Sequence, residues 1–482
     1  MGRERVPLLV GVVVALFVAG GSVAYPTLPS YDSMWSLVWA QEMLHGELPS
    51  FDAYRAPTEH PLGLLMSLAI APLGEAVAPR AFVAITLLSF AALLAGMVRL
   101  GALTLGLLAG LIAAVLLLTR LNFAFLAAFG YFDVPFLALL VWAGALVAED
   151  EGRRVRQRPL VWALLIAAGL LRPEAWAFAI LYGAWSWRSA TAKQRLWILL
   201  AMAAAPLLWA LTDLVVTGDP AFSLTYSTDH AAELGRNRGL LELPRATLSS
   251  AGEFVKPPVL AAACIGIVLA LWRRPRLAVV PLVLTAGGVA TFLIVSQQGF
   301  SVIPRYFALA AVGLCLFAGH AVGGWELLRR GSAARRWWIV AALPALVAGG
   351  AVALVTLNPA KVDAELRLRE RVFGDLAALL DSPAVRTGRR CGPVSLPNHK
   401  LAPYARWWLD AGSDEVIARS DRRALARTVR GVALEVRDVP GLRAHTAFGP
   451  RANPQDSPAI GPAPAGFRRA AARATLIAWV RC

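Results

Sequence analysis

A concentration of acidic side chains separates the first two long apolar runs of the chain. Asp32 directly follows the first run, and its carboxylate could take a proton from an acceptor hydroxyl as a general base. The alternative is that Asp32 is the N-cap of the helix that follows it, a position that Asp favours. The other carboxylates of residues 31–63 are Glu42, Glu47, Asp52 and Glu59. We expect Asp32 and Glu59 to be functional, and the other three to be solvated or to cap helices.

The motif PTEHPLG places Glu59 and His60 at the start of a short apolar segment, Leu62–Leu73. A carboxylate next to an imidazole could hold a divalent cation or a phosphate, or orient a substrate. The alternative is a structural helix start, because proline is favoured at the first helical position and Pro61 stands there. Whether a divalent cation is required stays open.

Further ionisable residues stand at the ends of later apolar runs. Asp133 begins one run in YFDVPF, where it is either a functional group or an N-cap. Arg172 and Glu174 lie between two runs in LLRPEAW, and Arg305 and Tyr306 begin another in VIPRYF. Arginine suits bidentate phosphate contacts, although each arginine could instead anchor a helix end at lipid headgroups. Together these residues suit a cavity for a phosphate and a polar acceptor.

The composition predicts an integral membrane protein. Of the 482 residues, 57% are hydrophobic and only 16% are charged, and the mean hydropathy is +0.59. Soluble domains carry about 25% charged residues. The net charge of +16 does not indicate nucleic-acid binding, because arginines cluster in short loops between apolar runs, as in a membrane topology signal.

About eleven apolar runs are long enough, with their flanking residues, to be membrane-spanning helices of roughly 17–25 residues. Leu62–Leu73 is too short and is expected to be interfacial or re-entrant. The expected spans are near Pro7–Tyr25, Arg80–Val98, Leu103–Leu118, Val134–Ala148, Leu160–Leu171, Ala175–Trp187, Leu196–Val216, Pro258–Trp272, Leu277–Val295, Tyr306–Val322 and Trp337–Leu357.

The distribution of arginine predicts the orientation. Short arginine-rich loops fall on the side of the N-terminus, so the N-terminus is expected to be cytoplasmic and the protein to be multi-pass in the cell membrane. An odd number of spans then makes the polar tail, residues 358–482, extracytoplasmic. The first outer loop would be residues 26–79, where Trp35 and Trp39 belong to an apolar helix face expected to rest on the membrane.

The tail is expected to be a small α/β domain that follows a transmembrane domain of residues 1–357. VDAELRLRERVFGDLAALLD predicts an amphipathic helix, and CGPVSL, GVALEVRDV and ATLIAWVRC predict strands. Cys391 and Cys482 stand beside two of these strands and either form a disulfide or stay free.

The sequence resembles the GT-C membrane glycosyltransferases, including aminoarabinose transferase and the protein O-mannosyltransferases. The resemblance rests on Asp32 after the first apolar run, GELP at Gly46–Pro49, EHPL at Glu59–Leu62, VAPRAF around Arg80 and FDVPFLAL at Phe132–Leu140. It is clearest over residues 6–220. It departs from many members at Ser33, where a second acid would stand, and at His60, where some carry Lys.

The resemblance implies a transferase that uses a polyprenyl-phosphate sugar donor and inverts the sugar at an outward-facing site. Asp32 would be the base and would activate a hydroxyl of a glycan, lipid or protein acceptor. Arg172 and Arg305 would stabilise the lipid phosphate. Glu59, His60, Asp133, Glu174 and Tyr306 would complete the substrate-binding site.

Two other functions fit a chain with many spans less well. A transporter or lipid-linked sugar flippase is the main alternative, but transporters commonly show repeated halves with a polar site at mid-membrane. Here the ionisable residues stand at helix ends, and the halves show no similarity. A membrane-anchored sensor would need only one span.

Overall fold

The structure is a computed structural model that forms two compact units. The first contains Met1–Gly21, Ala84–Leu211 and Asn237–Asn358, and the second contains Ser22–Val83, Thr212–Arg236 and Pro359–Cys482. The structure describes residues 5–24, 27–153, 158–233, 243–297, 303–356, 359–421, 423–437 and 463–482. The boundary predicted at residues 357 and 358 lies outside these ranges.

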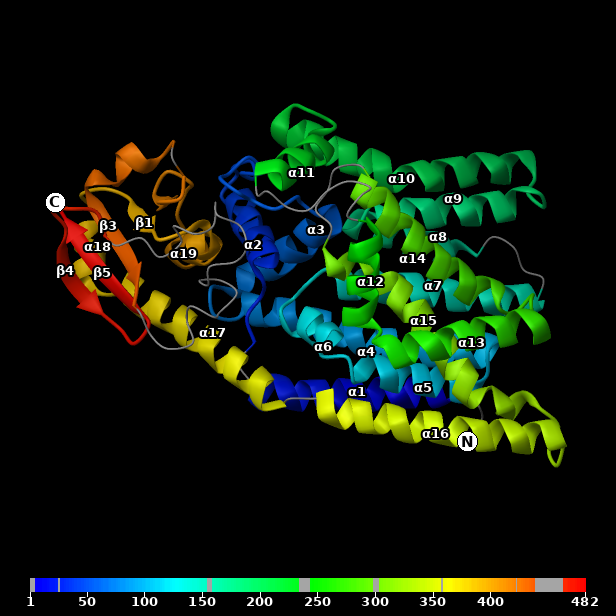
Figure 1. Ribbon diagram of the computed structural model, residues 1–482. Helices are drawn as coiled ribbons and strands as arrows, with labels where there is room; N and C mark the ends of the chain where they lie inside the picture. The colour runs from blue at the N-terminus through cyan, green and yellow to red at the C-terminus, as the bar shows by residue number, and fades with distance from the viewer. Residues whose placement is uncertain are drawn as a thin grey trace. The chain divides into compact units, whose positions relative to one another are not determined.

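The first unit is helical, and each of the eleven apolar runs forms a helix (Figure 1). Short 3-10 helices are labelled η. The helices lying wholly or mostly in this unit are α1 (Arg5–Ala24), α4 (Ala78–Thr104), α5 (Leu107–Leu118), α6 (Leu121–Ala128), α7 (Asp133–Arg153), α8 (Pro159–Leu171), α9 (Glu174–Trp187), α10 (Ala192–Thr217), α12 (Leu243–Phe254), α13 (Pro257–Arg273), α14 (Val279–Gln297), η2 (Pro304–Phe307), α15 (Ala308–Gly323), η3 (Gly324–Leu327) and α16 (Ala333–Thr356).

Helix α15 is the core of the first unit, packed by α5, α13 and α14. Small residues let these helices approach closely, as is typical of helix packing in membranes. A Cβ added at Gly266 would lie 1.9 Å from the Phe317 carbonyl oxygen. One added at Gly319 would lie 2.2 Å from the Ala109 carbonyl oxygen. Side chains at these two positions would therefore separate α13 and α5 from α15.

The apolar surface of the first unit supports a multi-pass membrane protein. The most apolar part of Pro304–Leu327, which contains α15, is 94% buried, whereas that of α16 is only 6% buried. Helix α16 also presents Leu354 and Val355 outward. Such a large exposed apolar surface is typical of a membrane-facing helix. Among the described residues, four helices are long and apolar enough to span a membrane, or up to six if each of two bent pairs is one span.

The bent pairs and the shorter apolar helices account for most of the difference from eleven spans. Helices α5 and α6 meet at 68°, and α12 and α13 meet at 98° around Lys256. Lys256 has a positive φ of 71°, and Pro257 follows it as the first residue of α13. This backbone cannot continue α12 as a straight helix.

The second unit combines helices with a small sheet near the C-terminus (Figure 1). Its helices are α2 (Tyr31–Leu44), α3 (Pro61–Ile70), η1 (Ala71–Leu73), α11 (Phe222–Glu233), α17 (Pro359–Leu380), α18 (Pro383–Gly388), η4 (His399–Leu401), α19 (Ala402–Leu409) and η5 (Leu425–Val429). The strands are β1 (Val394–Leu396), β2 (Val416–Ala418), β3 (Gly431–Val436), β4 (Arg468–Ala472) and β5 (Leu476–Arg481), in the order β2-β1-β3-β5-β4.

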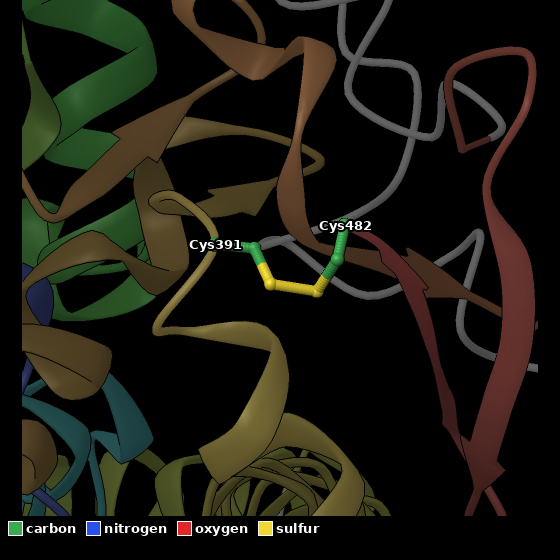
Figure 2. The surroundings of a disulfide bond; sticks show 2 residues. All are labelled: Cys391 and Cys482. Atoms are coloured by element: carbon green, nitrogen blue, oxygen red, sulfur yellow. A yellow bond between two sulfur atoms is a disulfide. The ribbon is translucent and has the colours of Figure 1, made fainter.

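The structure confirms the three predicted strands, which are β1, β3 and β5, and the predicted amphipathic helix, which is α17. Strand β1 pairs in parallel with β2 and β3, and β5 pairs antiparallel with β3 and β4. Helices α17 and α18 pack against β5. Cys391 precedes β1 and Cys482 follows β5, and a disulfide joins them (Figure 2). This cross-link ties the last strand to the segment that leads into the first.

The prediction that the Trp-rich face of α2 rests on the membrane is wrong. Trp35 and Trp39 are only 2% and 1% exposed, and their rings pack against each other. Trp39 also meets Phe51 edge-to-face, and the guanidinium of Arg406 in α19 lies over Trp35. The apolar face of α2 is therefore covered by protein of its own unit.

Candidate active site

Asp32 lies in the first turn of α2, but it is not the N-cap. Ser30 holds that position, and its hydroxyl accepts a hydrogen bond from the Ser33 backbone N–H. The alternative interpretation of Asp32 as a cap is therefore wrong. Asp32 is half-buried, whereas every residue from Ser33 to Ala40 is buried. The helix thus fixes its backbone and leaves part of its side chain accessible.

The segment before α3 folds back on the start of α2. The Tyr31 hydroxyl donates a hydrogen bond to the Arg55 carbonyl oxygen, at 2.8 Å. Burial raises the pKa of this phenol well above its usual value, so Tyr31 stays protonated. Arg55 has a positive φ of 56°, a conformation that is uncommon outside glycine. This turn keeps the Arg55 backbone next to Tyr31, which precedes the catalytic candidate Asp32 in the chain.

Two tail residues next to Tyr31 were not predicted as site residues. The ring of His399 meets the Tyr31 ring edge-to-face at 5.5 Å, and its Nδ1 lies 3.4 Å from Nη1 of Arg55. The ammonium of Lys400 lies 5.5 Å from the centre of the Tyr31 ring. These residues are more than 340 positions from Tyr31 along the chain, so local spacing carries no signal for them. The scarcity of lysine could have drawn attention to Lys400.

Glu42 is not solvated, contrary to the expectation from the sequence. Its Oε1 accepts a hydrogen bond from Nη2 of Arg406 at 2.5 Å, and both of its oxygens accept hydrogen bonds from Ser50. Arg406 is only 2% exposed, and a buried guanidinium needs a carboxylate partner. Glu47 and Asp52 are exposed, as expected.

Glu59 points away from solvent into a cluster with two residues that the sequence did not single out. It is 1% exposed, and its Oε2 lies 2.6 Å from the Ser223 hydroxyl. The same hydroxyl lies 2.7 Å from Asp213 Oδ1, and the Ser223 backbone N–H donates to Asp213 Oδ2. Glu59 and Asp213 are thus two acids joined through one serine.

The cluster holds an extra proton at neutral pH. Burial and the neighbouring Asp213 raise the pKa of Glu59 from its ordinary value of 4.5 to about 8. Ser223 has a single hydroxyl proton to donate, so it can donate to only one of the two carboxyls. The protonated Glu59 can supply the second proton that the arrangement needs. Glu59 is therefore a neutral hydrogen-bond donor at pH 7.

His60 occupies the N-cap position of α3 without a side-chain cap hydrogen bond, and Pro61 is the first helical residue. The proline start that the sequence suggested is confirmed. His60 is half-buried beside the fully buried Glu59. Among the residues that the structure describes, no three side chains of His, Cys, Asp or Glu are grouped so that they could hold a metal ion.

The other five predicted residues come together in the first unit. Arg172 ends α8 in an extended conformation, as expected before a proline, and its guanidinium is held between two carboxylates. Its Nη1 lies 2.5 Å from Asp133 Oδ1, and its Nη2 lies 2.6 Å from Glu174 Oε1. The ring of Tyr306 lies 4.7 Å from its Cζ atom.

Arg305 and Tyr306, both from η2, complete the lining of a small cavity next to this ion-pair cluster. The guanidinium of Arg305 lies 5.0 Å from the centre of the Tyr131 ring. The cavity volume is about 10 Å³, which is enough for roughly one water molecule. Burial lowers the pKa of Arg172, but Asp133 and Glu174 outweigh it and raise the pKa above its usual value. The guanidinium of Arg172 therefore stays protonated, and the two carboxylates already balance its positive charge.

The eight predicted residues thus form two groups, one in each unit. Asp32, Glu59 and His60 belong to the second unit. Asp133, Arg172, Glu174, Arg305 and Tyr306 belong to the first, where they share one cavity. The second group joins three turns that are far apart in sequence, so five of the eight residues that were expected to share one cavity do line one.

Neither the protein-family models nor the curated proteins include a match to this sequence. Several solved structures match, among them two that are similar in fold. ArnT from Cupriavidus metallidurans, bound to undecaprenyl phosphate, matches 98% of this chain and 97% of its own length with a TM-score of 0.56 and 14% identity. The apo oligosaccharyltransferase of Archaeoglobus fulgidus matches 90% of this chain and 70% of its own length, with a TM-score of 0.51 and 13% identity. The chain therefore has the fold of the GT-C membrane glycosyltransferases that its sequence resembles.

Proposed function

We propose that this protein is a membrane glycosyltransferase that moves a sugar from a polyprenyl-phosphate donor to an acceptor hydroxyl on the outer face of the membrane. The observation that carries the proposal is the similarity to ArnT along 98% of the chain, because that structure holds undecaprenyl phosphate. The half-buried carboxylate of Asp32 after the first helix supports the same assignment.

In the proposed reaction, Asp32 removes the proton of the acceptor hydroxyl as its oxygen attacks the anomeric carbon. The bond between that carbon and the phosphate oxygen breaks, and polyprenyl phosphate leaves with the bonding electrons. A single displacement of this kind inverts the anomeric configuration. The proton ends on Asp32, and no bond between sugar and protein is formed.

Arg305 is the proposed contact of the lipid phosphate, assisted by the hydroxyl of Tyr306. Arg172 was predicted to share this role, but its charge is already balanced by Asp133 and Glu174. We therefore assign these three residues to holding η2 and its cavity in shape. Glu59, as a buried neutral acid, would position the segment that carries His60 and not contact the sugar directly.

The Asp32→Asn variant tests the proposed base. Purified membranes would be incubated with a radiolabelled polyprenyl-phosphate sugar and with native cell-envelope acceptors. The amide preserves the shape of the side chain but cannot accept the proton, so we expect retained donor binding and transfer reduced about 10²-fold or more. Asp52→Asn is the matched control, because Asp52 is an exposed acid of the same loop. Full transfer by Asp32→Asn would refute the role of Asp32.

A further inference from the structure

A second cavity lies within the second unit, at the opposite end of α2 from Asp32. It has a volume of about 510 Å³, which falls in the range of about 300–1,000 Å³ that is usual for ligand pockets. The last turn of α2, the segment 71–77 and two tryptophans of α19 line it. Asp32 and Gln41 are nine residues apart, or about 14 Å along a helix. The groove therefore lies outside the reach of a single sugar bound at Asp32.

Two tryptophans form the aromatic wall of this groove. Trp407 is 3% exposed, and its indole N–H donates a hydrogen bond to the Glu75 carbonyl oxygen at 3.1 Å. Trp408 is half-buried, and its indole N–H lies 3.3 Å from Asp381 Oδ2, which accepts its hydrogen bond. Both rings are thus held by their N–H groups, and the half-buried Trp408 keeps part of its ring surface for contact with a ligand.

Neither lysine nor arginine belongs to the described lining of the groove, although the whole chain carries a net charge of +16. Gln41, His45 and Glu75 belong to the lining, and His45 lies 3.5 Å from Asp410. Partial burial and the nearby Asp381 and Asp410 raise the pKa of Glu75 above its usual value. An anionic ligand would meet further negative charge here, whereas a cationic group would relieve the repulsion.

We propose that this groove is a saccharide-binding subsite that prefers neutral or amino sugars over acidic ones. A sugar ring has an apolar C–H face that can stack on the Trp408 indole, and hydroxyl groups that can bond to Gln41, His45 and Glu75. An ammonium group on the sugar would gain both an ion pair with Glu75 and a cation–π contact with Trp408. A phosphate headgroup lacks these partners and is repelled by the acids.

Isothermal titration of the full-length protein in detergent tests the proposal without any transfer reaction. The probes are short oligosaccharides of glucosamine, N-acetylglucosamine and galacturonic acid, at neutral pH. We expect the glucosamine oligomers to bind best, the N-acetylated ones more weakly and the acidic ones least. Trp408→Ala should weaken both of the first two about tenfold, the size of a stacking or cation–π contact of about 1.4 kcal/mol.

Glu75→Gln separates the charge from the stacking. It should reduce the preference for glucosamine to the part that the cation–π contact with Trp408 provides, while N-acetylglucosamine binding stays unchanged. Glu370→Gln, at an exposed acid on α17, should change neither. Absence of saccharide binding at millimolar concentration, or wild-type binding by Trp408→Ala, would overturn the subsite. Equal binding of the acidic oligomers would overturn the charge preference. Because donor and catalysis play no part, failure here leaves the proposed transferase function standing.

Discussion

Glu59 illustrates how burial changes the chemistry of one side chain. In the sequence Glu59 stands beside a histidine, so it is expected to be ionised and to help bind a divalent cation or a phosphate. In the folded protein it is buried against Asp213, and two carboxylates that share one serine repel each other if both are ionised. Glu59 therefore stays protonated in the folded protein, and its hydrogen bonds stabilise the segment before α3.

This proton makes stability depend on pH in an unusual direction for a glutamate. The pKa of Glu59 is raised from 4.5 to about 8, so between these values the folded state binds a proton that the unfolded chain releases. Its contribution to the free energy of unfolding is complete below about pH 4.5 and is lost as the pH rises through about 8. Glu59→Gln removes this titration and keeps a hydrogen-bond donor.

We therefore expect the melting temperature of the detergent-solubilised protein to fall less between mildly acidic and mildly alkaline pH in Glu59→Gln than in the wild type. Thermal unfolding at several pH values measures it. Glu47→Gln, an exposed acid of the same loop, should follow the wild-type profile. Parallel profiles for Glu59→Gln and the wild type would contradict the raised pKa.

Arg172 should be structurally more important than most arginines of this chain. Arg172→Leu leaves Asp133 and Glu174 buried without their shared cation, and breaking such a pair costs about 3–5 kcal/mol. Adding Asp133→Asn to this variant should recover part of the loss, because one unpaired charge is removed. Thermal unfolding measures both, and the exposed Arg188→Leu is the control. A stability for Arg172→Leu equal to that control would show that the ion pairs contribute nothing.

Among the elements, α11 acts as a clamp on the segment that leads into α3. The Tyr226 hydroxyl lies 3.1 Å from the Ala56 carbonyl oxygen and 3.4 Å from that of Ala53, and Thr58 bonds to Ser227 one position further. Together with Ser223, these residues occupy successive positions on one side of α11. The helix therefore holds the backbone around Arg55 and Glu59 at several points.

Tyr226→Phe tests this clamp. It removes the donor to the Ala56 carbonyl and leaves a partly buried acceptor unsatisfied, at a cost of about 1–3 kcal/mol. We expect faster hydrogen–deuterium exchange in peptides covering residues 50–60, with little change in the helices of the first unit. Thr228→Ala, on the exposed side of the same helix, should leave these peptides unchanged. Faster exchange spread evenly over the protein would argue for general destabilisation instead.

At the scale of the whole molecule, the sequence predicts local elements far better than long-range partners. Long apolar runs form helices because their backbone polar groups must bond internally, so each predicted run is helical. Whether a run spans the membrane depends on bends such as the 98° turn at Lys256, which hydropathy does not detect. The burial of Trp35 and the pairing of Glu42 with Arg406, 364 positions away, depend on tertiary contacts that periodicity does not encode.

The same contrast between local patterns and long-range partners holds for the candidate site. The polar residues at helix ends predicted the cluster around Arg172, because connecting turns at the same end of a helix bundle lie close together. Asp213 and Ser223 escaped notice because each looks ordinary in sequence: an acid near the end of an apolar helix and a serine in a polar segment. Only the fold brings both to Glu59, more than 150 positions away.

The orientation of the tail is the last prediction, and the disulfide between Cys391 and Cys482 favours the outer side of the membrane, where disulfides persist. Single cysteines placed at Glu370 in the tail and at Lys193 at the start of α10 test it, in a background where the exposed Cys264 is replaced by alanine. In intact cells, a membrane-impermeant maleimide should label the cysteine at position 370 and leave that at position 193 unlabelled. Labelling at 193 alone would invert the topology and would move the proposed transfer reaction to the cytoplasmic face.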